Sequence, residues 1–456
     1  MKSTYICRMS IENSPLTLGT ERISKLLTQY AIPAIIAMTA SSLYNMADSI
    51  FIGQGVGSMA IAGLALTFPL MNLAAAFGSL VGVGASTLVS VKLGQKEYEG
   101  ANRVLGNVLS LNVCLGIAFT VIFLLVLDPV LYFFGASENT LPYAREYMQV
   151  ILIGNVFTHM YLGLNAVLRS SGFPKLAMFA TLASVVINCI LTPLFIFAFG
   201  WGIKGAAWAT VISQVISLIG QLIHFSKPQQ LLHFQRGMYQ LRSDIVRGII
   251  SIGLSPFLMN LCSCLIVILI NRGLKEHGGD MAIGAYGIVN RIIFIFVMII
   301  MGFNQGMQPI AGYNFGARQY SRVMEVTKLT MKWAVGVATA GFLLCHLYPT
   351  PIIRLFTSDV ELIKVAVDGL HIVFAVFPIV GFQMVATNFF LSIGQANKAI
   401  FLSLTRQMLF LVPCLLLLPP WLGAFGVWVS MPVSDLISTV LTAIVLVSQF
   451  KYFRNQ

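Results

Sequence analysis

The stretch LTQYAIPAIIAMTASSLYNMADSIFIGQGVG, residues 27–57, is one of the apolar stretches from which the fold is predicted. It is apolar and long enough to cross a membrane as a helix, yet it contains one acid, Asp48. A charged carboxylate inside hydrocarbon costs about 2.5–3.5 kcal/mol on insertion scales, so Asp48 must be paired, protonated or facing water. Two interpretations follow. Either Asp48 exchanges an ion during transport, or it is a solvated structural residue at the mouth of its helix.

Pro33 lies fifteen positions before Asp48 on the same predicted helix. Proline removes a backbone hydrogen bond from a helix and allows it to bend. A titratable acid and a bend on one helix together predict a conformational switch, with Pro33 as its hinge.

The composition indicates a membrane protein with many spans, because 57% of the 456 residues are hydrophobic and only 10% are charged. Apolar spans long enough to cross a bilayer recur twelve times, at 24–52, 59–89, 103–134, 143–167, 175–199, 204–226, 246–271, 281–311, 325–348, 364–393, 399–420 and 424–450. The predicted fold is therefore all-α, with twelve transmembrane helices.

The net charge of +12 could suggest a nucleic-acid partner, but the placement of the basic residues argues for membrane topology instead. With the odd-numbered loops outside, those loops hold only six of the 28 basic residues: Arg145, Lys204, Arg272, Lys275, Arg354 and Lys364. The positive-inside bias then places both termini in the cytoplasm, so we expect an integral protein of the cytoplasmic (inner) membrane.

The two halves of the chain are related by an internal repeat with an offset of about 222 residues. GVGASTLVSVKLGQKEY (82–98) aligns with GFNQGMQPIAGYNFGARQY (302–320), so that Gly84 meets Gly306. The repeat predicts an amino-terminal six-helix lobe (1–226), a cytoplasmic linker (227–246) and a carboxy-terminal six-helix lobe (247–456). Two lobes of like orientation can rock about a cleft and give alternating access.

Four segments together carry a family resemblance: LYNMADSIFIGQGVGSMAIAGLALTFPL (43–70), GVGASTLVSVKLGQK (82–96), NCILTPLFIFAFGWGIKGAAWATVIS (188–213) and MQPIAGYNFGARQY (307–320). The chain resembles the multidrug and toxic compound extrusion (MATE) family over nearly its whole length, and most closely the DinF-like branch. That resemblance implies a monomeric exporter of small-molecule drugs or toxic metabolites in a lipid membrane, driven by an ion gradient.

The resemblance also implies a cation-coupling site in the amino-terminal lobe. Its acid on the first helix is matched by Asp48 and its bend-forming proline by Pro33. The remaining polar positions are matched by Tyr147, Asn165, Asn188 and Thr210.

This chain departs from the branch at Thr192, because related sequences often carry an Asp there, one helical turn after Asn188. Both side chains still share one helical face, but only Asp48 can change charge. A single carboxylate favours one proton, or one weakly held sodium ion, as the coupling ion.

In the carboxy-terminal lobe, the charged residues Arg291 and Asp435 lie deep inside predicted spans. A buried charge needs a partner, so an Arg291–Asp435 pair is the simplest prediction, and ion or substrate binding by Asp435 is the alternative. His159 on the fourth span is interpreted as a packed, hydrogen-bonded histidine rather than a proton relay.

No enzymatic motif is present, and the seven cysteines have neither a disulfide nor a metal-binding spacing. We therefore predict no catalytic residue, no metal, no cofactor and no nucleic-acid partner, with H⁺ or Na⁺ as the coupling ion. The alternatives to an exporter of amphipathic, cationic compounds are a lipid-linked precursor flippase, which would need deep arginines for pyrophosphate, and an intramembrane enzyme acting on lipid.

Overall fold

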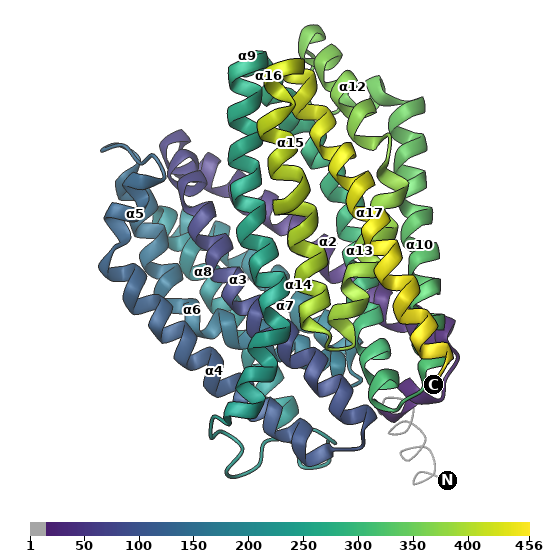
Figure 1. Cartoon of the computed structure of the whole chain (residues 1–456). Helices are drawn as coiled ribbons and strands as arrows, with labels where there is room; N and C mark the ends of the chain where they lie inside the picture. Colours follow the sequence, from purple (N-terminus) through teal and green to yellow (C-terminus); the bar gives the residue numbers. More distant parts are fainter. Residues whose placement is uncertain (1–14) are drawn as a thin grey trace. The chain divides into compact units, whose positions relative to one another are not determined.

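The computed structural model describes residues 15–456, and every regular element in that range is a helix (Figure 1). The first half contains these helices: η1 (Pro15–Gly19), α2 (Ile23–Gly55), α3 (Ser58–Gly94), α4 (Tyr98–Leu125), α5 (Leu127–Phe133), α6 (Leu141–Ser170), α7 (Pro174–Pro193), the π-helical η2 (Leu194–Ala198) and α8 (Gly202–Phe225).

The second half begins with the longest helix and continues in shorter pieces: α9 (Ser243–Gly316), α10 (Tyr320–Leu347), α11 (Pro349–Arg354), α12 (Val360–Phe374), α13 (Phe377–Ser392), α14 (Ala396–Leu404), the π-helical η3 (Thr405–Leu411), α15 (Val412–Leu417), α16 (Pro419–Leu422) and α17 (Ala424–Arg454).

Ten of the described helices are long and apolar enough to cross a membrane, and α12 with α13 forms an eleventh span bent by 51°. Helix α9 supplies two spans, because its backbone breaks at Gly279, where φ is +68°. Only glycine adopts that conformation without strain. The described residues therefore confirm the predicted all-α fold with twelve candidate spans.

The helix ends follow local chemistry. Proline occupies the first turn of α6, α7 and α13, where its missing N–H breaks no helical bond. Asp359 caps α12 by accepting hydrogen bonds from the backbone N–H groups of Glu361 (2.9 Å) and Leu362 (3.3 Å).

The chain forms two compact units, which differ from the lobes predicted from chain order. Unit 1 contains Ile36–Phe257 and the described residues up to Glu21, whereas unit 2 contains Arg22–Ile35 and Leu258–Gln456. The first part of α2 thus belongs to unit 2 and its remainder to unit 1. The first part of α9 belongs to unit 1 and its remainder to unit 2.

Close glycine contacts hold these first parts in place. In unit 1, a Cβ on Gly84 of α3 would lie 2.0 Å from the carbonyl oxygen of Ile249 on α9. In unit 2, a Cβ on Gly306 would lie 2.7 Å from the Cα of Ala31 on α2. Gly84 and Gly306 are equivalent in the sequence repeat, so the repeat extends to the packing of both units.

The segment between α8 and α9 packs on α4 within unit 1. The buried amide of Asn107 donates to the carbonyl oxygens of Met238 (3.4 Å) and Gln240 (3.1 Å) and accepts from the backbone N–H of Arg242 (3.0 Å). Asn102 accepts from the N–H of His233 (2.9 Å). These side chains replace the backbone partners that an irregular segment lacks.

Candidate functional site

Asp48 lies on the second part of α2, and its residue is only 6% exposed. The Thr192 hydroxyl, near the end of α7, is 3.1 Å from Asp48 Oδ1. No basic side chain in the described part of the chain pairs with this carboxylate. The surroundings of Asp48 are therefore polar but neutral.

The polar cluster continues from Thr192 across α7 to α8. Thr192 Oγ1 lies 3.0 Å from Asn188 Oδ1, and the Asn188 amide donates to Thr210 Oγ1 (3.1 Å). Thr210 in turn donates to the carbonyl of Ala206 (3.2 Å). Asn188, Thr192 and Thr210 are all buried, so these bonds are shielded from competing solvent.

The number of hydrogens constrains this chain of bonds. Thr192 has one hydroxyl hydrogen, yet two oxygens lie within hydrogen-bond distance, on Asp48 and on Asn188. Because the Asn188 amide nitrogen is engaged by Thr210, its carbonyl oxygen faces Thr192. Both Thr192 contacts are hydrogen bonds at once when Asp48 is protonated. Its O–H then donates a hydrogen bond to Thr192 Oγ1, and the Thr192 hydroxyl donates to Asn188 Oδ1.

Two tyrosines complete the cluster. Tyr147 on α6 is 2% exposed and interacts with Asp48, Tyr44 and Thr210. The Tyr44 hydroxyl lies 3.1 Å from Thr210 Oγ1. Our sequence reasoning missed Tyr44, although its position four residues before Asp48 places both side chains on one helical face.

Asn165 is not part of this cluster. It lies eighteen residues after Tyr147 on α6, which corresponds to about 27 Å along the helix axis. Its amide donates to the carbonyl of Ala177 (2.9 Å), and its oxygen accepts from Arg169 (2.5 Å). The structure thus brings together Asp48, Tyr147, Asn188, Thr192 and Thr210, and places Asn165 elsewhere in unit 1.

Pro33 lies inside α2, which continues as a helix on both sides of it. The division between the two compact units falls between Ile35 and Ile36, two residues after the proline. Helix α2 therefore lacks a backbone hydrogen bond close to the point where it changes unit.

The predicted Arg291–Asp435 pair is wrong. Asp435 accepts a hydrogen bond of 2.8 Å from Nε of Arg406, which lies on the π-helical η3. Arg291 is exposed. In the sequence, Arg406 lies near the beginning of a predicted span and reads as an interfacial residue, whereas η3 packs against α17 and brings it to Asp435.

His159 is fully buried on α6, and its Nε2 lies 2.9 Å from the carbonyl oxygen of Ala74 on α3. The ring of Phe119 packs edge-on against the imidazole at 6.3 Å. The expected hydrogen bond and packing are therefore present. Within residues 15–456, no group of three or more His, Cys, Asp or Glu side chains is arranged to hold a metal ion.

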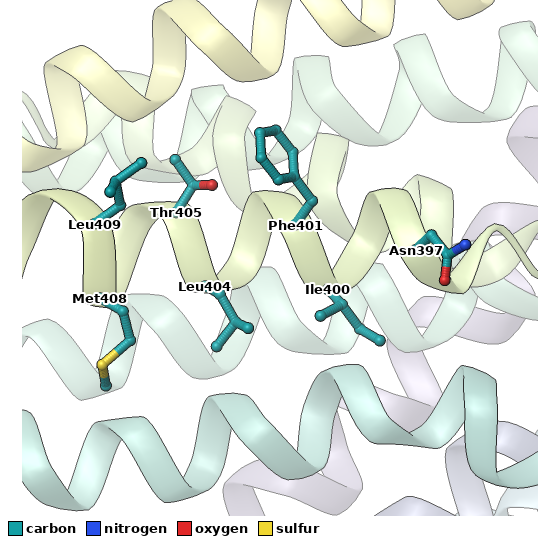
Figure 2. Close-up of a pocket in the computed structure, with 7 residues that line it drawn as sticks. All are labelled: Asn397, Ile400, Phe401, Leu404, Thr405, Met408 and Leu409. Carbon is teal, nitrogen blue, oxygen red and sulfur yellow. The ribbon is translucent and has the colours of Figure 1, made fainter.

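A groove of about 490 Å³ lies along α14 and η3 in unit 2 (Figure 2). Ile400, Leu404 and Met408 point to one side of this helix, and Phe401, Thr405 and Leu409 to the other. No predicted site residue lines the groove, and its lining offers no titratable group.

Two relatives cover almost the whole chain. The multidrug export protein MepA of Staphylococcus haemolyticus (strain JCSC1435) is 27% identical over 426 residues, which cover 93% of this chain and 94% of that protein. MepA of Staphylococcus aureus (strain N315) is 28% identical over 417 residues, which cover 91% of each.

Solved structures share the fold. A crystal structure of MATE in the bent conformation matches with a TM-score of 0.92 at 23% sequence identity, covering 97% of this chain and 98% of that one. The outward-facing conformation of a multidrug resistance MATE family transporter of the MOP superfamily matches with a TM-score of 0.90 at 23% identity, covering 96% of this chain and 98% of that one.

The family model described as MatE matches two stretches, residues 33–194 and 252–416. These stretches begin at equivalent places in the two halves of the sequence repeat and together include most of the chain. The protein is an integral membrane protein with candidate spans throughout both halves. The chain belongs to the MatE family.

Proposed function

We propose that the chain is a secondary active multidrug exporter that extrudes amphipathic, cationic organic compounds in exchange for protons. The names of the relatives support multidrug export, since each is called a multidrug export protein and is matched over more than nine tenths of its length. The Asp48 cluster supports ion coupling, because it holds one buried acid that has no basic partner among residues 15–456.

The Thr192 hydroxyl is the observation that favours protons over sodium. With Asp48 protonated, one direction of donation satisfies every member of the chain: Asp48 to Thr192, then Thr192 to Asn188. The amide of Asn188 then donates to Thr210. With Asp48 ionised, the single Thr192 hydrogen can bond to only one of the two oxygens, and the other contact has no hydrogen. Binding and release of a proton at Asp48 would therefore reorganise this cluster.

The protein exchanges protons for substrate when the protonation of Asp48 controls the release of the substrate. A proton bound from outside neutralises Asp48, and its later loss to the cytoplasm restores the charge. Pro33 is positioned to convert that change into a bend of α2. Exchanging one proton for one singly charged cation moves no net charge, so the pH difference across the membrane drives uphill export.

The remaining features of this proposal follow the charge pattern and the family. The protein works as a monomer in the cytoplasmic membrane with both termini in the cytoplasm, uses no cofactor and catalyses no chemical conversion. The assignment to the DinF-like branch remains a prediction.

The test is substrate efflux in proteoliposomes under separately imposed proton and sodium gradients. We expect ethidium transport to follow the proton gradient and to be lost in Asp48→Asn. Transport that follows sodium alone would replace protons with sodium as the coupling ion. A wild-type rate in Asp48→Asn, at equal reconstitution, would remove Asp48 from the mechanism.

A further inference from the structure

A polar stripe runs along one face of α8, from Thr210 towards the end of the helix at Phe225. Polar residues recur at intervals of three or four positions, which is the spacing of a single helical face: Thr210, Ser213, Ser217, Gln221 and His224. The opposite face carries Ile216, Ile219 and Ile223, which are 45%, 49% and 56% exposed. The stripe therefore faces the interior of unit 1.

The first part of the stripe has hydrogen-bond partners. Thr210 belongs to the Asp48 cluster, and the Ser213 hydroxyl donates to the carbonyl oxygen of Thr210 (2.8 Å). Ser184 of α7 approaches the Ser213 hydroxyl at 3.4 Å. The polar groups thus continue without a break from Asp48 to the middle of α8.

The second part of the stripe is buried but unpaired. Ser217, Gln221 and His224 are 5%, 1% and 9% exposed. Within residues 15–456, four of their atoms have no hydrogen-bond partner: Ser217 Oγ, Gln221 Nε2, Gln221 Oε1 and His224 Nε2. Buried polar atoms are rarely unpaired in proteins, and a glutamine amide with no bond on either end is the strongest case here.

Helices α6 and α7 face these unpaired groups. Helices α7 and α8 are antiparallel, as shown by the contact of Ser184 with Ser213 and that of Phe173 with His224, whose ring centroids are 4.6 Å apart. This register places Thr181 at the level of Ser217 and Ala177 at the level of Gln221.

The groups on α6 and α7 at these levels are also polar. The Tyr161 hydroxyl donates to Thr181 (3.3 Å), and Asn165 donates to the carbonyl of Ala177 (2.9 Å). We call this group of polar side chains on α6, α7 and α8 the polar column; its members are Tyr161, Asn165, Thr181, Ser217, Gln221 and His224.

An arginine lies at the far end of the polar column. Arg169 is half-buried and follows Asn165 by one helical turn, and its guanidinium donates to Asn165 Oδ1 (2.5 Å). In the described part of the chain no acidic side chain pairs with it. A fixed positive charge beside a narrow polar path repels protons and other cations but does not exclude water.

We propose that the polar column binds water beneath Asp48, and that Arg169 closes it to protons. Water molecules supply the donors and acceptors that Ser217, Gln221 and His224 lack. A water-filled path that ended near the coupling acid would leak protons through unit 1. The charge of Arg169 prevents that leak. This second role rests on the proposed coupling by Asp48, whereas the binding of water does not.

The first experiment measures water in the column by cysteine reactivity. Ser217→Cys and Gln221→Cys are made after replacement of the seven native cysteines, and each is treated with neutral methyl methanethiosulfonate. Because only a thiolate in contact with water reacts, we expect both to be modified about tenfold faster than the control Ile219→Cys on the opposite face. Rates no faster than that of Ile219→Cys would overturn the water column.

The second experiment measures proton leak in proteoliposomes that contain a pH-sensitive dye and no substrate. Arg169→Gln removes the charge, and we expect it to raise the leak about tenfold or more, whereas Arg169→Lys keeps the charge and the wild-type rate. Gln221→Leu in the Arg169→Gln background should lower the leak again by replacing the amide with an apolar side chain.

These variants separate the alternatives. A leak that is also present in Arg169→Lys, or that survives Gln221→Leu, would be a general loss of packing and would overturn the role of Arg169; an absent leak in Arg169→Gln and in Arg169→Met would do the same. The cysteine experiment tests water in the polar column whatever the coupling ion is. If the efflux assay excludes proton coupling, the cysteine rates still decide whether the column holds water.

Discussion

Each unit contains a buried acid, but the two acids have different partners. In unit 1, Asp48 faces hydroxyl and amide groups and has no basic partner among the described residues. In unit 2, Asp435 forms an ion pair with Arg406 at 2.8 Å, and the side chains are 12% and 27% exposed. A carboxylate beside a guanidinium keeps its charge, whereas one among neutral dipoles can give it up. The proposed function therefore uses Asp48 for charge exchange, and the ion pair gives Asp435 a structural partner.

Asp48→Asn tests this difference most strongly. The amide keeps the shape of the side chain but cannot change its charge, so we expect proton-driven efflux to fall to the background of empty vesicles. Asp435→Asn, measured beside it at equal reconstitution, should retain transport. Similar losses in both variants would contradict the division of roles.

The second prediction concerns stability in unit 2. Asp435→Asn leaves the charge of Arg406 without a counter-ion and should lower the free energy of unfolding by about 2 kcal/mol, the low end for buried pairs because Arg406 is 27% exposed. The double variant Arg406→Gln/Asp435→Asn should recover most of that loss, as measured by thermal unfolding in detergent. A double variant as unstable as the sum of the singles would mean that the two residues are not coupled.

The third prediction concerns the hydroxyl of Thr192 in unit 1. Thr192→Val keeps the shape but removes the hydroxyl that joins Asp48 to Asn188, so we expect efflux to fall several-fold while Thr192→Ser stays near the wild type. Thr192→Asp adds a second carboxylate and should strengthen cation binding, read as protection by sodium against heat. Strong protection of the wild type by sodium, unchanged in Thr192→Asp, would argue for sodium coupling.

The smallest effect is expected at Pro33. Pro33→Ala restores a backbone hydrogen bond near the point where α2 passes between units, so turnover should fall a few-fold while substrate affinity is retained. Pro69 lies inside α3 and provides the matched control. Equal effects of Pro33→Ala and Pro69→Ala would assign the loss to helix stability in general rather than to a hinge.

Hydrophobicity made the helices predictable. Every apolar span in the sequence became helical, and the predicted spans 246–271 and 281–311 are both present, although α9 joins them across Gly279. The predicted span 364–393 is divided into the bent pair α12 and α13. The neighbours Asn188 and Thr192 were also predictable, because four residues on one helix share a face.

The contacts between helices were less predictable than the helices themselves. Asn165 matched a family position, yet the eighteen residues between it and Tyr147 on the predicted span 143–167 already correspond to about 27 Å along a helix. Arg406 was missed as the partner of Asp435 because packing of η3 on α17, rather than sequence distance, decides which charges meet. The hydrophobic pattern also does not indicate that residues 22–35 belong to unit 2 rather than to unit 1.

The exchange of helix segments sets an order for biosynthesis. Residues 22–35 leave the ribosome long before their packing partner Gly306, which lies near the end of α9. Unit 1 in turn lacks its Ile249 contact until translation has passed the segment between α8 and α9. A chain divided within that segment would yield two fragments, neither of which contains a whole unit. Each unit is therefore complete only when both halves of the chain are present.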